Sequence, residues 1–381
     1  MTIYADHNAT SPLRPEAREA MLAAMDAGAN PSSVHAPGRA ARKLMEAARE
    51  DVGGAIGVRA QDLVFTSGGT EANALALIGA AAQLDGRATL LISALEHESV
   101  ANNAARAGVP VELIPATAAG LVDLDWLRDR LARWEEADGA PLLSLMLANN
   151  ETGVIQPVAE AATLVRERDG LVHCDAVQGL GKIPVNPTLL GADYLALSAH
   201  KCGGPHGVGA LYVRPGAPLK PQLLGGGQER SVRSGTENLS GIAGFGAAAR
   251  AAVAELPSQA ARAAKRDAFE AKILAAAPGC IRFGAEAERL PNTSCFALPG
   301  FKSEIQVMSL DLAGRAISAG SACSSGKVKR SGVLSAMGVP DAVADCAIRT
   351  SYGWNTDDAD YDAVAEAWIA AAKRTVLKES A

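Results

Sequence analysis

Lys201 is the first residue whose surroundings could do chemistry. The stretch YLALSAHKCGGPHG places Ser198, His200 and Lys201 directly after an apolar run and before a glycine-rich turn, so the lysine can point into a cleft. Burial among apolar and cationic neighbours favours the neutral amine, which forms a Schiff base with an aldehyde cofactor. A single lysine is more often a surface residue, so the candidate partners of Lys201 decide between the two interpretations.

An acidic residue is the first such partner. Asp175 lies in the apolar run GLVHCDA, 26 residues before Lys201 (201 − 175). A carboxylate there could pair with a pyridinium nitrogen and keep the ring an electron sink. Gln178, three residues further on, could donate a hydrogen bond to a ring oxygen. The alternative for Asp175 is a loop residue that caps a helix.

Two other segments could hold the remaining parts of such a cofactor. FTSGGTEANALAL is typical of a strand, a glycine turn and a helix start, so the backbone N–H groups near Gly69 and Thr70 form an anion site suited to a phosphate. The run LISALEHESV leads to His97, which could stack on a planar ring and transfer protons, although a lone histidine is usually structural. The chain has neither GxGxxG nor GxxxxGK[ST], which argues against a nicotinamide enzyme and an NTPase.

Cys323 is the candidate nucleophile among six cysteines. Its segment, SAGSACSSGKVKRSG, is rich in Gly, Ser and Lys and predicts an exposed, electropositive loop that favours the thiolate. No CxxC spacing or metal-ligand pattern of histidines is present, so neither a zinc site nor a disulfide framework is expected. The other cysteines are expected to flank cofactor motifs (Cys174, Cys202) or to act as small core hydrophobes (Cys280, Cys295, Cys346).

The elements that must position these residues alternate along the chain. Apolar runs such as DLVFTS, ATLLISA, LLSLMLA, GLVHCDA and YLALSA are separated by helical stretches, which predicts βα units and a mainly parallel sheet. Ligands of such sheets bind outside the carboxyl ends of the strands, where the candidate residues fall. From about Pro257 a helix, shorter strands (CIRFGA, TSCFALP) and a last helix after Thr356 predict a smaller α+β lobe.

Length and composition exclude several function classes. The 381 residues favour two domains or one large domain with a lobe, and a composition of 48% hydrophobic and 20% charged residues describes a globular chain. A net charge of −6 without a basic run argues against nucleic acid as a partner. No apolar stretch approaches the ~18 residues of a spanning helix, and the first residues lack a signal-peptide core, so a cytoplasmic protein without membrane contact is expected.

Ten motifs in collinear order carry a family resemblance. They are YADHNATSP, NPSSVH, TSGGTEAN, LEHES, NNETGV, HCDAVQ, SAHKCGGPHGVGALYV, GGGQERSVRSGTEN, SAGSACSS and IRTSYG. Together they resemble the cysteine desulfurases, which use pyridoxal 5'-phosphate (PLP) and release sulfur from L-cysteine. The resemblance implies the α/β PLP-dependent transferase fold of type I. We expect a large domain over 15–256 with a mainly parallel seven-stranded sheet, and a small α+β domain formed by 1–14 and 257–381.

The resemblance also implies roles for individual residues. Lys201 would hold the cofactor as a Schiff base, and Cys323 would receive the sulfur as a persulfide. Thr236 of the RSGTEN motif would reach the phosphate of a neighbouring subunit, which implies a homodimer. The remaining roles are contacts to the ring (Asp175, Gln178, His97), to the phosphate (Gly69, Thr70, Ser198, His200), to ring and substrate (Asn150) and to the substrate carboxylate (Arg349).

Some features depart from the family pattern and leave alternatives open. His206 and its neighbours in CGGPHG replace a bulkier residue and a frequent lysine. The resemblance implies that longer members dock an iron–sulfur scaffold through a C-terminal tail, so the acceptor here could instead be another scaffold, a sulfur carrier or a tRNA-thiolation protein. The rival activities are a selenocysteine lyase or another type I enzyme such as an aminotransferase. A non-catalytic sulfur or iron–sulfur binding protein is the rival from a different class.

Overall fold

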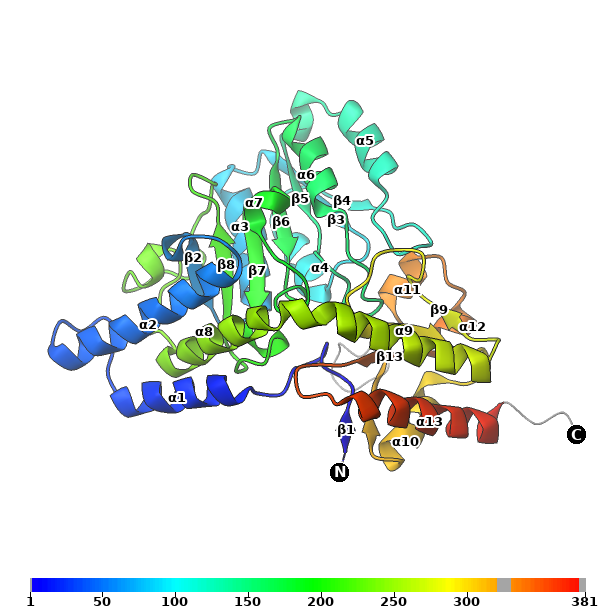
Figure 1. The fold of residues 1–381 in the computed structure, drawn as a ribbon. Coiled ribbons are helices and arrows are strands. Elements are labelled where there is room, and N and C mark those ends of the chain that lie inside the picture. Colours follow the sequence, from blue (N-terminus) through cyan, green and yellow to red (C-terminus); the bar gives the residue numbers. More distant parts are fainter. Residues whose placement is uncertain (1, 321–329, 377–381) are drawn as a thin grey trace, which may run out of the picture.

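A seven-stranded sheet forms the centre of the molecule (Figure 1), for which a computed structural model describes residues 2–320 and 330–376. The strand order is β2-β8-β7-β6-β5-β3-β4, and every strand runs parallel to the others except β8, which pairs antiparallel with β2 and β7. The predicted mainly parallel seven-stranded sheet is therefore confirmed. Its strands are β2 (Leu63–Thr66), β3 (Ala88–Ser93), β4 (Val111–Ile114), β5 (Ala140–Ser144), β6 (Leu171–Asp175), β7 (Tyr194–Ser198) and β8 (Gly209–Val213).

Helices cover both faces of this sheet, because alternate side chains of a strand point to opposite faces. In β3, Leu90 and Ile92 pack with α3 (Gly69–Gln83) and α4 (Glu98–Ala104), whereas Leu91 packs on the other side. Strands buried on both faces are apolar throughout, which is why the runs could be found in the sequence. The second face is covered by α1 (Pro15–Ala27), α2 (Ala36–Ala55), α5 (Leu124–Ala132), α6 (Val158–Arg166) and α8 (Leu239–Ala254).

A second, smaller sheet follows in the last third of the chain. Its order is β12-β13-β10-β9 and all its pairs are antiparallel. Its core is centred on Trp368, whose Nε1 donates to Gln306 Oε1 at 2.7 Å. The elements of this part of the chain are α9 (Gln259–Ala276), β9 (Ile281–Arg282), β10 (Thr293–Ala297), α10 (Ser303–Leu312), β11 (Arg315–Ala316), β12 (Ser318–Ala319), α11 (Gly332–Ala336), α12 (Asp341–Ala344), β13 (Ala347–Ser351) and α13 (Asp358–Thr375). The short α7 (Pro187–Leu190) lies earlier in the chain, between β6 and β7.

The residues that precede α1 pack against the part of the molecule that contains the second sheet. Strand β1 (Ile3–Tyr4) pairs parallel with β11, and His7 N donates to Ser351 O at 3.0 Å. This arrangement is compatible with the predicted assignment of 1–14 and 257–381 to one domain, whose bounds stay a prediction.

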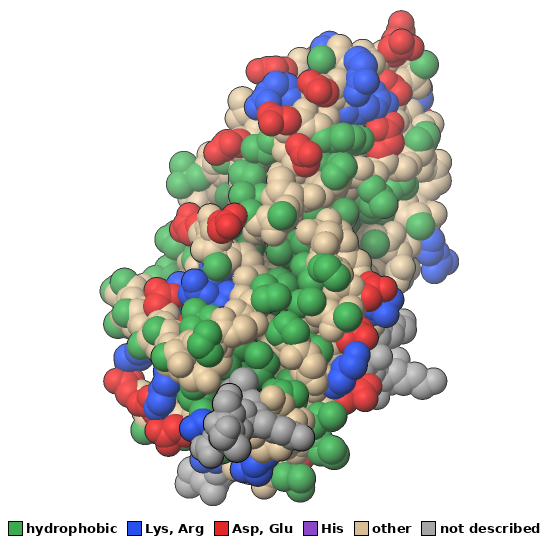
Figure 2. Space-filling view, turned by 90° about the vertical axis from the view of Figure 1, so that its right-hand side faces the viewer, with side chains coloured by type: hydrophobic (Ala, Val, Ile, Leu, Met, Phe, Trp, Pro, Cys, Tyr) green, Lys and Arg blue, Asp and Glu red, His purple; other side chains and the backbone are tan. Residues whose placement is uncertain are grey.

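The surface combines charged ends with an apolar middle on one side. Figure 2 shows the face at the right of Figure 1, with acidic and basic side chains gathered at its upper end and hydrophobic side chains across its centre. Large side chains exposed elsewhere on the chain include Val34 (88%) and Leu224 (83%). Over the described ranges, no single helix has the length and apolar composition to cross a membrane, although the bent pair Leu239–Ala254 and Leu256–Ala276 meets both criteria when taken together.

Candidate active site

One cavity of about 310 Å³ brings most of the predicted site residues together, a volume within the ~300–1,000 Å³ usual for ligand pockets. It lies at the carboxyl ends of β2, β3, β5, β6 and β7, where an α/β sheet binds its ligands. Its lining comprises nine predicted residues (Gly69, Thr70, His97, Asn150, Asp175, Gln178, Ser198, His200, Lys201) and six others (Ala9, Asn73, Ser99, Met146, Ala148, Val177).

The glycine turn after β2 leads directly into α3, whose first residue is Gly69. A Cβ built on Gly69 would lie 2.7 Å from Val177 Cγ2, so any other residue would force the cavity wall to move. A Cβ on Gly209 of β8 would lie 2.6 Å from the backbone carbon of Gly68. The absence of a side chain at Gly209 therefore allows β8 to pass close to the glycine turn. The start of α3 therefore presents backbone N–H groups and the positive end of the helix dipole to the cavity.

Asp175 is held by a chain of buried polar groups. Its Oδ2 accepts from Asn73 Nδ2 at 2.8 Å, and its Oδ1 accepts from Val177 N at 3.0 Å. Asn73 Oδ1 lies 3.1 Å from His173 Nε2, and His173 Nδ1 lies 2.8 Å from Ser144 Oγ. Since Asn73 Oδ1 can only accept, His173 carries its proton on Nε2 and Ser144 donates to Nδ1. Burial lowers the pKa of His173 to about 4, so this ring is neutral and fixes the orientation of the Asn73 amide.

His97 is oriented by the start of α4, which it caps. Its Nδ1 accepts from Ser99 N at 3.0 Å and lies 2.8 Å from Ser99 Oγ. With Nδ1 occupied as an acceptor, the neutral ring carries its proton on Nε2. Because His97 lines the cavity, Nε2 is the atom available for proton exchange there.

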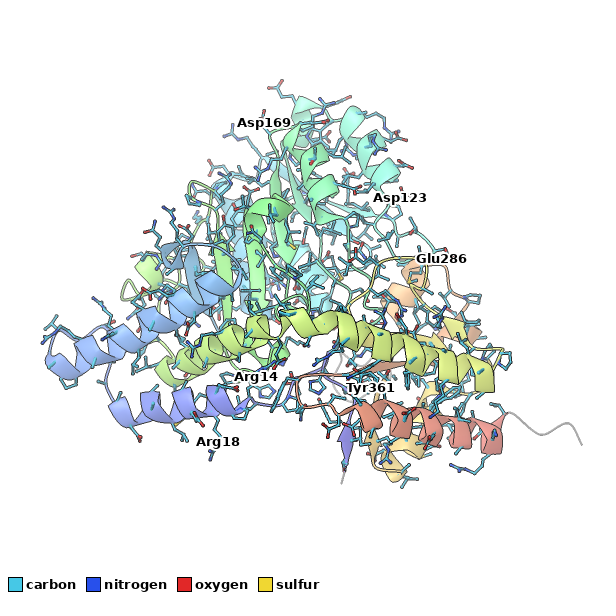
Figure 3. All side chains as sticks on the ribbon, in the orientation of Figure 1. Arg14, Arg18, Asp123, Asp169, Glu286 and Tyr361 are labelled. Carbon is cyan, nitrogen blue, oxygen red and sulfur yellow. The ribbon has the colours of Figure 1, made fainter. Side chains whose placement is uncertain are left out.

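Lys201 lies in the turn after β7 and reaches back to the N-terminal segment. Its Nζ donates to the backbone oxygens of Asn8 at 2.6 Å and Ala9 at 2.9 Å. Arg14 fixes the next turn, since its Nε donates to Cys202 O at 2.9 Å and its guanidinium pairs with Glu255 at 2.6 Å. Figure 3 shows Arg14 at the start of α1, below α8. The N-terminal segment is thus part of the cavity floor.

His200 directs its Nδ1 toward Thr10 of the N-terminal segment. Thr10 Oγ1 lies 3.1 Å from His200 Nδ1 and 3.0 Å from His206 Nε2, and the two imidazoles stack with centroids 5.3 Å apart. Burial, then Lys201 and His206, lower the pKa of His200 to about 4. The Thr10 hydroxyl has one hydrogen for these two nitrogens; when His200 Nδ1 accepts it, His200 keeps its proton on Nε2, which suits an anionic ligand. His206, the departure noted in the sequence, therefore takes part in orienting this donor.

Asn150 and Arg349 meet beside the cavity. The backbone oxygen of Asn150 accepts from Arg349 NH1 at 2.9 Å, and Arg349 NH2 pairs with Asp6 at 2.5 Å. Asp6 also accepts from Ser318 Oγ at 2.8 Å, on the strand paired with Arg349. Arg349 does not line the cavity that the described residues form, so its predicted contact with a substrate carboxylate stays a prediction.

Two buried carboxyl groups lie behind the same wall. Glu96 Oε1 accepts from Met146 N at 2.6 Å, and burial, followed by the charge of Asp175, raises the pKa of Glu96 well above its usual range. Glu151 accepts from Ser331 Oγ at 2.5 Å, and burial raises its pKa to about 7. Both groups therefore favour the protonated form more than an exposed glutamate does.

Like Arg349, the predicted site residue Thr236 lies outside the cavity lining. Thr236 is exposed, between β8 and α8, and is absent from the lining that the described residues provide. Cys323 lies outside the described residues. The other five cysteines are buried, and burial raises the thiol pKa of Cys174, Cys202, Cys280 and Cys295.

Sequence reasoning missed Asn8, Thr10, Asn73 and Lys182, all of which contact predicted site residues. The first three occur inside motifs already noted, YADHNATSP and TSGGTEAN, but an amide or a hydroxyl has no diagnostic chemistry of its own. Their roles become visible only when the fold brings segments about 100 to 190 residues apart into contact.

Comparisons with known proteins agree with this geometry. The family described as "Aminotransferase class-V" matches residues 3–364. The chain is 40% identical over 364 residues to "Cysteine desulfurase IscS" of Dictyoglomus turgidum, covering 94% of this chain and 91% of that protein. A solved NifS-like protein from Rickettsia africae is 35% identical with a TM-score of 0.88, over 97% of this chain and 99% of the other. A structure of "SspA in complex with cysteine" is 30% identical with a TM-score of 0.78, over 93% and 100%.

These matches extend over nearly the whole chain, as the ten collinear motifs do. They confirm the predicted resemblance and the predicted α/β fold, since the solved protein from Rickettsia africae matches 97% of this chain with a TM-score of 0.88. The chain belongs to the aminotransferase class-V family.

Proposed function

We propose that the protein is a cysteine desulfurase that binds PLP in the cavity at the carboxyl ends of the sheet. One observation carries the proposal: the cavity gathers an amine, a carboxylate and a helix start from separate strand ends, as the chemistry of this cofactor requires. The relatives named cysteine desulfurases support L-cysteine as the substrate.

The residues present fit PLP. The start of α3 at Gly69 and Thr70, together with Ser198 and His200, would hold the phosphate, and Asp175 would pair with the ring nitrogen. Gly69 supports this assignment because a side chain there would collide with the opposite wall. When bound to an amino acid, PLP draws electrons from its Cα and so weakens the bonds of that carbon and its neighbours.

The chain's own groups would bind the substrate and move its protons. Lys201 Nζ would hold the cofactor aldehyde and, once released by the substrate, carry the proton of the substrate Cα. Arg349 would bind the carboxylate with its planar fork, after exchanging Asp6 for the ligand. His97 Nε2 would exchange the proton of the substrate thiol, since its Nδ1 is fixed by Ser99.

Cys323 would receive the sulfur. Its thiolate would attack the substrate sulfur, so that an S–S bond forms while the C–S bond breaks. The net reaction, L-cysteine plus enzyme thiol giving alanine plus enzyme persulfide, balances without an external oxidant.

A homodimer would complete the phosphate site through Thr236. The exposed position of Thr236 supports a role outside its own cavity. Leu223 O accepts from Ser234 N at 3.0 Å, and Leu224 beside it is 83% exposed, so an apolar surface adjoins the segment that carries Thr236. The acceptor that takes the sulfur from Cys323 would be a separate protein.

The visible spectrum and the reaction products test the proposal. The purified protein should show the yellow band of a lysine-bound PLP, which Lys201→Ala abolishes, and should form alanine and persulfide from L-cysteine. Cys323→Ser should keep the band and lose sulfur transfer. A colourless protein would refute the cofactor and favour a sulfur-binding protein, whereas alanine formation only from selenocysteine, or amino transfer without sulfide, would identify the rival enzymes.

A further inference from the structure

Lys182 is a buried lysine that the proposed mechanism does not use. It lies seven residues after Asp175, the last residue of β6 (182 − 175), and is only 8% exposed. Its Nζ donates to Gln178 Oε1 at 2.6 Å and to Asn8 Oδ1 at 2.9 Å. Within the described part of the chain, no carboxylate lies within 4.0 Å of this ammonium. Lysines are almost never buried without a counter-charge, so the position demands a reason.

The two amides around Lys182 can adopt only one orientation. Lys182 Nζ donates both hydrogen bonds, so the oxygens of both side chains face it. Asn8 Oδ1 therefore faces Lys182, and Asn8 Nδ2 donates to Thr293 Oγ1 at 2.9 Å. Gln178 Oε1 faces Lys182, and its Nε2 donates to Asn8 O at 3.0 Å.

This orientation leaves a donor for a ligand. An amide Nε2 carries two hydrogens, and the hydrogen bond to Asn8 O uses one of them. Gln178 lines the cavity, so the second hydrogen is available there. If the amide were reversed, Gln178 would instead present an acceptor, which would repel an oxygen anion.

The environment of Lys182 lacks an anion that would stabilise its charged form among the described residues. Burial, followed by Lys201 and Arg349, lowers the pKa of Lys182 well below its usual range. All three influences disfavour the ammonium form in the protein alone. An anion in the cavity would oppose them, and Gln178 links the ammonium to the cavity by a single hydrogen bond of 2.6 Å.

We propose that Lys182 is a positioning residue which, through Gln178, directs a hydrogen-bond donor and positive potential at an anionic ring oxygen of the cofactor. The proposal rests on the proposed function, because it requires a bound pyridoxal ring. A lysine kept only for packing would leave the electronic properties of that ring unchanged.

The test uses the complete protein with PLP and two readouts other than turnover. One is the pH midpoint at which the visible band of the bound cofactor changes; the other is the dissociation constant of PLP. Lys182→Met should raise the midpoint by about 1 pH unit, because removing a neighbouring cation eases protonation of the bound cofactor. The dissociation constant should rise about five- to tenfold through the weakened donor.

A double-mutant cycle separates positioning from independent effects. Gln178→Leu should shift the midpoint in the same direction, and Lys182→Met with Gln178→Leu should shift it by less than the sum of the two single shifts, because part of the lysine's effect passes through the amide. Lys220→Met, at an exposed lysine, is the matched control and should match the wild type.

The outcomes are distinct. An unchanged midpoint in Lys182→Met, or shifts that add in the double variant, overturns this inference while the proposed function stands. A wild-type protein without the visible band overturns the proposed function first. If Lys182→Met does not fold, Lys182→Gln keeps a donor without the charge, and an unchanged midpoint there also overturns the inference.

Discussion

Replacing Asn73 by Ala should destabilise the protein through the groups that it leaves behind. The Asn73 amide donates to Asp175 at 2.8 Å and accepts from His173 at 3.1 Å. An unpaired buried polar group costs ~1–3 kcal/mol. Asp175 borders the cavity and can be hydrated there, so about 1 kcal/mol is expected from it, whereas His173 is 0% exposed and about 2 kcal/mol is expected. The free energy of unfolding should therefore fall by about 3 kcal/mol.

Urea unfolding of the two proteins, followed by far-ultraviolet circular dichroism, measures this difference. Asn102→Ala is a matched control because Asn102 is exposed on α4, and it should change the free energy of unfolding by less than ~0.5 kcal/mol. If Asn73→Ala lost less than about 1 kcal/mol, the chain from Ser144 to Asp175 would not be the buried network described above. A loss confined to PLP affinity would lead to the same conclusion.

Three further changes have defined outcomes. Gly69→Ala should weaken PLP binding about tenfold or more in an equilibrium titration, because its Cβ would lie 2.7 Å from Val177, and overpacking costs ~1–3 kcal/mol; unchanged affinity would contradict the phosphate assignment. Thr10→Val should weaken PLP binding about threefold to tenfold, since His200 Nδ1 loses its hydrogen-bond partner, and a normal affinity would show that Thr10 does not orient the ring. Burial raises the pKa of Glu151 to about 7 in the folded protein. The contribution of this carboxyl group to stability is therefore complete at pH values below its pKa in the unfolded chain, and it is lost as the pH rises toward 7. Glu151→Gln should therefore gain stability relative to wild type between pH 5 and 8, by up to ~3 kcal/mol, and a constant difference across that range would argue against a shifted carboxyl.

The strands and the residues at their ends could be predicted because the relevant signals are local. A strand buried on both faces is apolar along its length, and a polar residue after it lies at the sheet edge where ligands bind. Asp175, His97 and Lys201 were found in this way. Strand β8 shows the limit of the approach, because its sequence does not reveal that it runs antiparallel between β2 and β7.

The second layer of the site could not be predicted, because it depends on contacts between distant segments. Asn8 holds Lys201 across 193 residues and Asn73 holds Asp175 across 102 residues. Lys182 would be taken from sequence as one more surface lysine, since only burial reveals its role. Amides and hydroxyls serve almost any position in a protein, so their identity carries little information until the fold supplies their partners.

The placement of Asn8 also has a consequence for how the protein is made. The residues that floor the cavity are synthesised before the segments that hold them, since His7 N donates to Ser351 O at 3.0 Å and Ile3 pairs with Arg315. Domains generally fold in the order of synthesis, so the large sheet can form while the last third of the chain is still being translated. The N-terminal segment must wait for β11 and β13 before it can seat beneath Lys201. Nascent chains stalled before residue 351 should therefore contain the sheet without a completed cavity floor, and cofactor capture should be one of the last events of biosynthesis.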